Sequence, residues 1–345
     1  MAGENVKAVT ISAGTVALKD LPVPKIASDE LLVHMRVCGV CGTDMEKIRG
    51  EQITPPILGH EVAGEIEQVG EQVQDFRRGD RVSVHHHVSC GNCFYCKNGL
   101  ETLCDSYPKS NLDPCGFAEY FRVPSTLVNG GAVHRLPESM TYIEGSQAEP
   151  TACCIRALQK AGVKAGSTIA IFGVGPVGLA HVQLAKAYGV SRVIAIDILE
   201  NRRQMAVRVG ADLTIDPASE NVTEIVASAT QGLGTDYAIV ATGNMKALEQ
   251  AFSAVRKGGQ VMLFGAPPRG TQLSLDVSRL FLREIMFQSS YSTSETEMRM
   301  ALNFIEKKRI NPSAIVTHTL PLTRTLEAFS LAEKGESVKV VVENG

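Results

Sequence analysis

The stretch TIAIFGVGPVGLAHVQLAKAYG, residues 168–189, predicts the fold of the chain beyond residue 150. A short apolar strand leads into a turn that carries Gly173, Gly175 and Gly178, and a helical stretch follows. Glycines in this context allow a tight turn and let backbone N–H groups approach a pyrophosphate at the helix N-terminus. The stretch therefore predicts a dinucleotide-binding turn. The alternative is a structural glycine turn that binds no nucleotide.

Asp197 indicates which dinucleotide is bound. It ends the next apolar run, RVIAID, about 20 residues after Gly178, where a carboxylate accepts hydrogen bonds from a ribose 2′-hydroxyl. A 2′-phosphate would be repelled there, so the position favours NAD over NADP. Arg202 points the other way, because an arginine can receive a phosphate.

Around residue 150 the hydrophobic pattern changes. After it, apolar strands alternate with helical stretches, and the strands read TIAIF, RVIAID, ADLTI, DYAIVAT, QVMLFG and EIMFQSS. This alternation predicts an α/β domain with a doubly wound sheet of six parallel strands. Before residue 150, short strands separated by turn residues (KAVTI, ELLVHMRV, VAGEIEQVG and DRVSVHHHV) predict a compact, barrel-like β domain.

Composition excludes several classes of protein. The chain has 345 residues, 44% of them hydrophobic and 21% charged, which is typical of a globular protein of two domains. Its net charge of -3 argues against nucleic acid or an anionic membrane as the main partner. The N-terminus lacks a signal-peptide pattern, and no apolar run is long enough to span a bilayer. We therefore expect a cytoplasmic protein.

Four of the nine cysteines stand together in CGNCFYCKNGLETLC, residues 90–104. Thiolates at this spacing can close a tetrahedral zinc site, and four of them leave no open position, so Cys90, Cys93, Cys96 and Cys104 predict a structural zinc. The alternatives are a disulfide pair and a zinc ribbon that binds nucleic acid. The neighbouring residues 85–87, three histidines, are interpreted as strand and loop residues rather than extra ligands.

A second group of metal-binding residues lies in CGVCGTDMEKIRGEQITPPILGHE, residues 38–61. A catalytic zinc takes three ligands from Cys, His and Asp or Glu. The stretch offers a thiol at Cys41, an imidazole at His60 and carboxylates at Asp44 and Glu61, which can converge if the loop at residues 54–56 lets the chain fold back. The alternative is a buried cysteine and a loop histidine.

These motifs in order resemble the zinc-dependent medium-chain alcohol and polyol dehydrogenases: CGTD at 41–44, GHExxGxxxxxG at 59–70, the four-cysteine lobe and GVGPVG at 173–178. The sequence looks most like the sorbitol (L-iditol) and threonine dehydrogenase branch, because Glu149-Pro150 stands where alcohol dehydrogenases carry a third cysteine ligand. The resemblance implies a β-rich GroES-like catalytic domain over residues 1–150 and 291–345, and a Rossmann NAD-binding domain over 151–290.

The resemblance also implies roles for single residues. Cys41 and His60 would bind the catalytic zinc, and either Glu61 or Glu149 would complete its ligands. Asp44 would support a ligand or cap the following helix, and Thr43 would bond the substrate hydroxyl. Lys339 would face the pyrophosphate. Besides the three glycines, the expected cofactor contacts are Val177, Asp197, Arg202, Phe264, Gly265, Ala266, Ser290 and Tyr291.

One position departs from the pattern. Many relatives carry a histidine two residues after the Asp of CGTD, and this chain carries Glu46. A carboxylate could relay the substrate proton from Thr43, although its ordinary pKa near 4.3 makes it a weaker acceptor than imidazole. The alternative is a solvated surface glutamate. The departure also argues against a threonine dehydrogenase.

We therefore expect an enzyme that transfers hydride from a secondary alcohol, a polyol or sugar alcohol, to NAD, with catalytic and structural zinc. Threonine 3-dehydrogenase and a simple secondary-alcohol dehydrogenase are alternatives that would use the same residues. A zinc-free quinone or enoyl reductase of the same superfamily is a further alternative, but such chains generally lack both CGTD/GHE and the cysteine lobe. A non-enzymatic protein that binds zinc and nucleotide is the last. The expected partner is a small-molecule substrate, without nucleic acid or membrane, and the resemblance implies a homo-oligomer, either tetramer or dimer.

Overall fold

The computed structural model describes residues 5–12, 15–50 and 57–345, so the loop at residues 54–56 lies outside it. The chain divides into two compact units. The first comprises Met1–Ala152 and Thr293–Gly345, and the second comprises Cys153–Ser292. The chain therefore leaves the first unit once and returns to it for its last segment.

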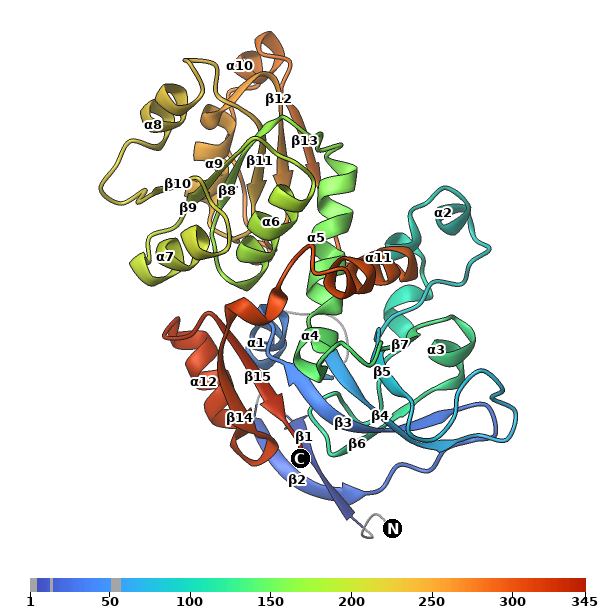
Figure 1. Ribbon diagram of the computed structural model, residues 1–345. Coiled ribbons are helices and arrows are strands. Elements are labelled where there is room, and N and C mark those ends of the chain that lie inside the picture. Colours follow the sequence, from blue (N-terminus) through green and yellow to red (C-terminus); the bar gives the residue numbers. More distant parts are fainter. Residues whose placement is uncertain (1–4, 13–14, 51–56) are drawn as a thin grey trace. The chain divides into compact units, whose positions relative to one another are not determined.

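A parallel sheet of six strands forms the centre of the second unit, in the order β10-β9-β8-β11-β12-β13 (Figure 1). Its strands are β8 (Thr168–Phe172), β9 (Arg192–Ile196), β10 (Leu213–Ile215), β11 (Thr235–Val240), β12 (Val255–Leu263) and β13 (Met286–Ser289). The predicted doubly wound sheet is confirmed, and all six predicted strands are present. The strand order reverses at β8, and ligands bind such sheets at the carboxyl ends of the strands beside this reversal.

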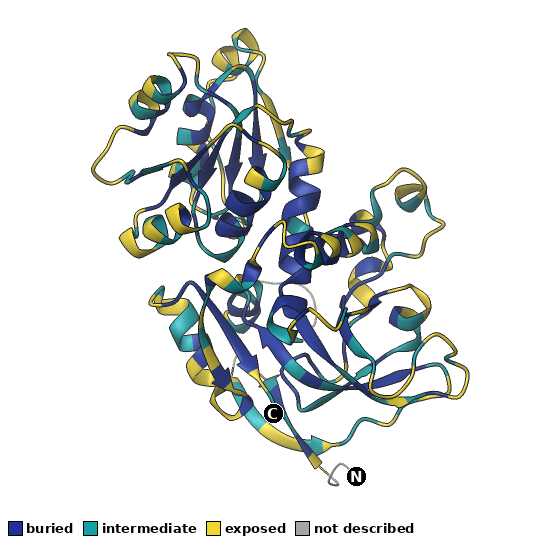
Figure 2. Ribbon diagram, in the orientation of Figure 1, coloured by how far each residue is buried: buried dark blue, intermediate teal, exposed yellow. Residues whose placement is uncertain are grey.

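Helices connect the strands of this sheet. They are α6 (Pro176–Ala187), α7 (Glu200–Arg208), α8 (Val222–Ala229), α9 (Met245–Ala254) and α10 (Val277–Leu282), and α5 (Ala148–Lys160) leads from the first unit toward β8. Because both faces are covered, the inner strands are apolar on both sides, and Phe172, Ile194 and Val240 have no exposed surface. Figure 2 shows the buried strands and the largely exposed α10.

The first unit is built on a mixed sheet. Among the described residues its order is β14-β15-β3-β4-β5-β7, with β6 paired to β3. The strands are β3 (Leu31–Gly39), β4 (Glu61–Val69), β5 (Arg81–Val84), β6 (Tyr120–Val123), β7 (Val133–Arg135), β14 (Val316–Pro321) and β15 (Lys339–Glu343). β1 (Asn5–Ser12) and β2 (Thr15–Pro22) form a separate antiparallel pair. The predicted β-rich domain is therefore present.

Short helices lie between these strands. They are α1 (Gly42–Ile48), α2 (Phe94–Lys97), α3 (Ser125–Asn129), α4 (Tyr142–Ser146), α11 (Glu295–Glu306), α12 (Thr325–Lys334) and the 3₁₀ turns η1 (Glu101–Leu103), η2 (Tyr107–Lys109), η3 (Pro312–Ile315) and η4 (Leu322–Arg324). Ser294 begins the returning segment as the N-cap of α11, in a capping box with Glu297. Across the described residues, no helix combines the length and apolar character needed to cross a membrane.

Candidate active site and zinc sites

The pairing of two neighbouring strands brings a thiol, an imidazole and a carboxylate together. β3 pairs with β4 so that Gly39 faces Glu61, and Cys41 follows as the N-cap of α1. The ligand atoms of Cys41, His60 and Glu61 lie within 4.8 Å of one another. His60 and Glu61 are buried, so water does not compete strongly for them. This donor set suits zinc.

Asp44 holds the two ends of this cluster in place. Its Oδ2 accepts a hydrogen bond from the N–H of Cys41 at 3.0 Å, and its Oδ1 accepts one from the N–H of Gly59 at 2.8 Å. Nδ1 of His60 lies 3.6 Å from the same Oδ1. Burial alone would raise the pKa of Asp44, but the His60 charge and these N–H donors lower it. The carboxylate therefore stays ionised and orients the His60 ring.

A buried ion pair fixes Glu61. A Cβ atom at Gly39 would lie 2.0 Å from Oε2 of Glu61, so only glycine leaves room for this carboxylate. The Nζ of Lys339 pairs with Glu61 and also donates to the carbonyl of Val40 at 2.9 Å. Burial raises the pKa of Glu61, and the Lys339 charge partly offsets the rise. Lys339, expected at the pyrophosphate, thus contacts a candidate zinc ligand.

Glu149 belongs to a second buried cluster. It lies in the first turn of α5, and its carboxylate is within 4.8 Å of ring nitrogens of His85 and His86. The rings of His60 and His86 are 4.8 Å apart, so the two clusters adjoin. Burial, together with the neighbouring His87 and His60, lowers the pKa of His86 well below its usual value. The His86 ring is therefore uncharged.

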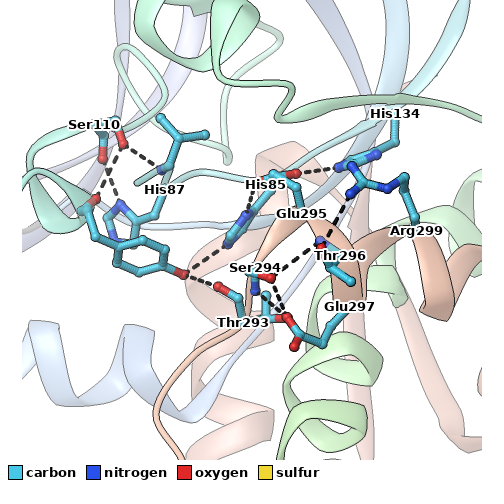
Figure 3. Close-up of polar contacts among 12 residues, drawn as sticks. His85, His87, Ser110, His134, Thr293, Ser294, Glu295, Thr296, Glu297 and Arg299 are labelled. Carbon is cyan, nitrogen blue, oxygen red and sulfur yellow. Dashed lines mark hydrogen bonds and ion pairs between the residues drawn. The ribbon is translucent and has the colours of Figure 1, made fainter. Parts of the chain in front are cut away.

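Glu295 supports this second cluster from the returning segment. Nδ1 of His85 and Nε2 of His134 each lie 2.6 Å from one of its carboxylate oxygens (Figure 3). The hydroxyl of Tyr107 lies 3.3 Å from Nε2 of His85 and donates to the carbonyl of Thr293 at 2.6 Å. Both ring nitrogens of His85 are therefore engaged within the protein.

Thr43 and Glu46 lie three residues apart on α1, on the same face of the helix. Both are half-buried, and Thr43 is separated from Cys41 by one residue. The spacing is compatible with a path for a proton from Thr43 to Glu46. The relay from Thr43 to Glu46 stays a prediction.

The four cysteines of the lobe gather as the spacing predicts. Their sulfur atoms lie within 4.8 Å of one another, and Sγ of Cys96 is 3.9 Å from that of Cys90 and 3.5 Å from that of Cys93. A zinc tetrahedron with bonds of about 2.3 Å places its sulfurs about 3.8 Å apart. All nine cysteines are free thiols, so the disulfide alternative is not formed. Burial would raise the pKa of Cys104, but backbone N–H groups of Cys90 and Ser106 lower it to about 6, which favours a metal-binding thiolate.

In the second unit, the glycine turn connects β8 to α6. Gly173 has a φ of +82°, which side chains disfavour. A Cβ atom at Gly178 would lie 2.0 Å from the carbonyl oxygen of Gly173, so the helix packs against the turn only because this residue is glycine. Gly175 is the N-cap of α6, and Pro176 and Val177 open the helix. Backbone N–H groups at this end suit a phosphate.

Asp197 lies beside this turn. Its Oδ2 accepts a hydrogen bond from the N–H of Val174 at 2.8 Å, and its Oδ1 accepts one from that of Leu199 at 2.9 Å. Arg202 lies 3.9 Å from this carboxylate, and its guanidinium is 3.7 Å from where a Cβ of Gly175 would be. The structure thus brings Asp197 and Arg202 together at the glycine turn.

The other predicted cofactor residues follow the last two strands of the sheet. Phe264, Gly265 and Ala266 come directly after β12, and Ser290 and Tyr291 after β13. Gly265 is packed against the backbone of Thr242, where a Cβ would lie 2.5 Å from it. The Phe264 ring packs edge-on against His181 of α6, with centroids 4.7 Å apart. These residues therefore lie beyond carboxyl ends of parallel strands, as a nucleotide site requires.

Comparisons with known proteins agree with this geometry. Residues 27–135 match the alcohol dehydrogenase GroES-like domain, and residues 176–307 match the zinc-binding dehydrogenase family. A sorbitol dehydrogenase of Bacillus subtilis is 32% identical over 98% of this chain and 97% of its own length. A D-arabitol-phosphate dehydrogenase of Enterococcus avium is 32% identical over 95% of this chain and 94% of its own. A zinc-binding dehydrogenase of Sinorhizobium meliloti, solved bound to NADP, has a TM-score of 0.90 at 30% identity, with 99% of this chain and 100% of that chain covered.

The chain belongs to the zinc-dependent medium-chain alcohol and polyol dehydrogenases. The expected family, the Rossmann fold and the GroES-like fold are thereby confirmed. This dehydrogenase is an enzyme that acts on an alcohol or polyol and uses zinc and a nicotinamide nucleotide. Its donor sets fit the metal: four thiols at zinc-like separations in the lobe, and the half-buried thiol of Cys41 beside the buried His60 and Glu61.

Some residues of the dehydrogenase's sites could not be found from motif spacing. The partners of His85 and Glu61 are Glu295 and Lys339, which come more than 200 residues later in the chain. The sequence indicates strand and loop residues at 85–87, and His86 lies just after β5, buried against His60. Three consecutive histidines directly after a strand were the only sequence signal for this placement.

Proposed function

We propose that this dehydrogenase oxidises a secondary alcohol of the polyol or sugar-alcohol class and transfers the hydride to NAD. The observation that carries the proposal is the pair of adjoining, largely buried clusters, Cys41–His60–Glu61 and His85–His86–Glu149. Such a concentration of buried polar groups suits a substrate that carries several hydroxyls. The relatives named above act, by their names, on sorbitol and on an arabitol phosphate.

Cys41 and His60 would hold the catalytic zinc, with Glu61 or Glu149 as the third ligand. When bound, zinc acts as a Lewis acid and lowers the pKa of an alcohol so that hydride can leave. Asp44 keeps the His60 ring oriented through the 3.6 Å contact at Nδ1, which leaves the other ring nitrogen for the metal. Lys339 neutralises Glu61, and this pairing favours Glu149 as the exchangeable carboxylate.

Thr43 would bond the reacting hydroxyl and take its proton toward Glu46 on the next turn of α1. In this proposal, residues 1–150 and 291–345 form the catalytic domain and residues 151–290 the nucleotide-binding domain. NAD is favoured over NADP because Asp197 places a carboxylate at the glycine turn, where it would repel a 2′-phosphate. The proposal extends to a cytoplasmic homo-oligomer, tetramer or dimer, and light scattering measures the assembly.

The experiment is NAD reduction by the zinc-loaded protein across sorbitol, other polyols, sugars, simple secondary alcohols and L-threonine. The proposal expects the highest kcat/KM with a polyol, and a higher value with NAD than with NADP. A clear preference for threonine would assign the protein to the threonine dehydrogenases, against the indication from Glu46. Preference for simple alcohols would leave the reaction in place and overturn the substrate class.

A further inference from the structure

His86 is a buried imidazole with an unsatisfied ring nitrogen. It is 6% exposed, and its Nδ1 has no hydrogen-bond partner among the described residues. Buried polar groups in proteins are nearly always paired, so an unpaired one needs an explanation. Its neighbours on the chain are satisfied: Nδ1 of His87 lies 2.7 Å from the carbonyl oxygen of Ser110, and His85 contacts Glu295 and Tyr107.

The position of His86 connects this ring to the reaction. Its centroid is 4.8 Å from that of His60, a candidate ligand of the catalytic zinc. One of its ring nitrogens is within 4.8 Å of the carboxylate of Glu149. His86 therefore adjoins both candidate ligands of the catalytic zinc, and all three residues belong to the first unit.

A third metal ion is a weaker explanation for this nitrogen. The cluster His85–His86–Glu149 has the composition of a metal site. However, Glu295 occupies Nδ1 of His85, as Figure 3 shows. The hydroxyl of Tyr107 lies 3.3 Å from Nε2 of the same ring. A metal in this cluster would have to displace the Tyr107 hydroxyl, which is itself anchored to the carbonyl of Thr293. Unlike His85, His86 has a ring nitrogen, Nδ1, with no hydrogen-bond partner among the described residues, so a substrate oxygen bound to it would not compete with an existing hydrogen bond at that nitrogen.

We propose that His86 hydrogen-bonds a second oxygen of the substrate, next to the carbon whose hydroxyl is oxidised, and so makes the enzyme select vicinal diols over mono-alcohols. The inference rests on the proposed function and deepens it. A histidine ring nitrogen can pair with a hydroxyl, because a hydroxyl both donates and accepts hydrogen bonds. An alcohol that lacks the second hydroxyl leaves this nitrogen unpaired, and sites with buried polar groups reject such analogues strongly.

The test compares 2,3-butanediol with 2-butanol, which differ by one hydroxyl, in the zinc-loaded wild type and two variants. His86→Asn keeps a donor and an acceptor, whereas His86→Leu has nearly the same shape and neither. We expect the diol-to-mono-alcohol ratio of kcat/KM to fall about tenfold or more in His86→Leu, and to stay within about threefold of wild type in His86→Asn. An equal fall of the ratio in both variants, or no fall in either, would overturn the inference.

A spectroscopic measurement decides the case even if His86→Leu does not fold. In the wild type with NADH, which cannot accept a hydride, ¹⁵N-histidine spectra are recorded while either alcohol is added. The ring-nitrogen signal that is missing in His86→Asn should shift with the diol and not with 2-butanol. The same shift with both alcohols would contradict the inference. A third zinc per chain in the wild type that is absent from His86→Asn would contradict it as well.

Failure of this inference differs from failure of the proposed function. If the wild type oxidises neither alcohol nor any polyol with NAD, the proposed function itself is wrong. If it oxidises both and the ratio does not respond to His86, the function stands and only the role of His86 is removed.

Discussion

Replacement of Asp44 by Asn tests how the chain prepares its catalytic metal site. The carboxylate accepts hydrogen bonds from the N–H groups of Gly59 and Cys41, at 2.8 and 3.0 Å, next to the two expected zinc ligands. The amide of asparagine keeps an acceptor oxygen for one of these two N–H groups and turns its NH₂ group, which cannot accept, toward the other. Hydrogen bonds to charged groups contribute about 1.5–3 kcal/mol each, so we expect the free energy of unfolding to fall by about 2–3 kcal/mol. Loss of a group that orients a ligand typically weakens metal affinity about 10- to 100-fold.

The assay is competition for zinc with a chelator, with urea unfolding measured in parallel. Asp236→Asn is the matched control, because Asp236 also accepts from a backbone N–H, that of Thr168 at 2.8 Å, and pairs with Arg256, but lies in the second unit. The control should lose stability and keep both zinc ions at wild-type affinity. If Asp44→Asn bound zinc as tightly as the wild type, the argument that Asp44 orients His60 would be refuted.

Four further outcomes are expected. Cys41→Ser should lower kcat roughly 10³-fold or more, because several kcal/mol of metal stabilisation are lost. Calorimetry should still show NAD binding to this variant, and near-normal turnover would exclude Cys41 as a ligand. Cys96→Ser should lose one zinc per chain and melt at a lower temperature, and an unchanged melting temperature after zinc loss would remove the structural role. Asp197→Ser should lower the NAD-to-NADP ratio of kcat/KM about tenfold, or about 1.4 kcal/mol; an unchanged ratio would show that the carboxylate does not discriminate. Burial would raise the pKa of Asp236, but the Thr168 N–H and Arg256 lower it. The stability that Asp236 contributes is therefore present above the unfolded pKa near 3.9 and is lost as pH falls through the pKa of the folded state. The stability difference between wild type and Asp236→Asn should therefore shrink below about pH 4, and a difference that persisted there would contradict this.

Local patterns were sufficient for the fold. TIAIF is apolar throughout and becomes β8, buried on both faces, and the glycines after it have the conformation and close contacts that the turn requires. The four cysteines of the lobe are close in sequence, so their spacing alone constrains them to one site. In these cases the interactions that decide the structure lie within about 20 residues, where sequence periodicity and spacing are informative.

Contacts between distant segments could not be predicted in the same way. Lys339 lies on β15, which reaches Glu61 because β15 pairs with β3 and β3 with β4. Glu295 reaches His85 only because the chain returns to the first unit at residue 293. Neither the lysine nor the glutamate belongs to a spaced motif. Burial of His86 likewise depends on how β5 and the loop after it pack. The alternation of apolar and polar residues along the sequence does not specify this packing.

The most direct test of a zinc held by Cys41 and His60 is anomalous diffraction at the zinc edge from crystals of the NAD complex. We predict two peaks per chain: one in the lobe, and one about 2.3 Å from Sγ of Cys41 and about 2.0–2.1 Å from a ring nitrogen of His60. A peak in the four-cysteine lobe with none between Cys41 and His60, in crystals of protein that oxidises a polyol, would contradict the account.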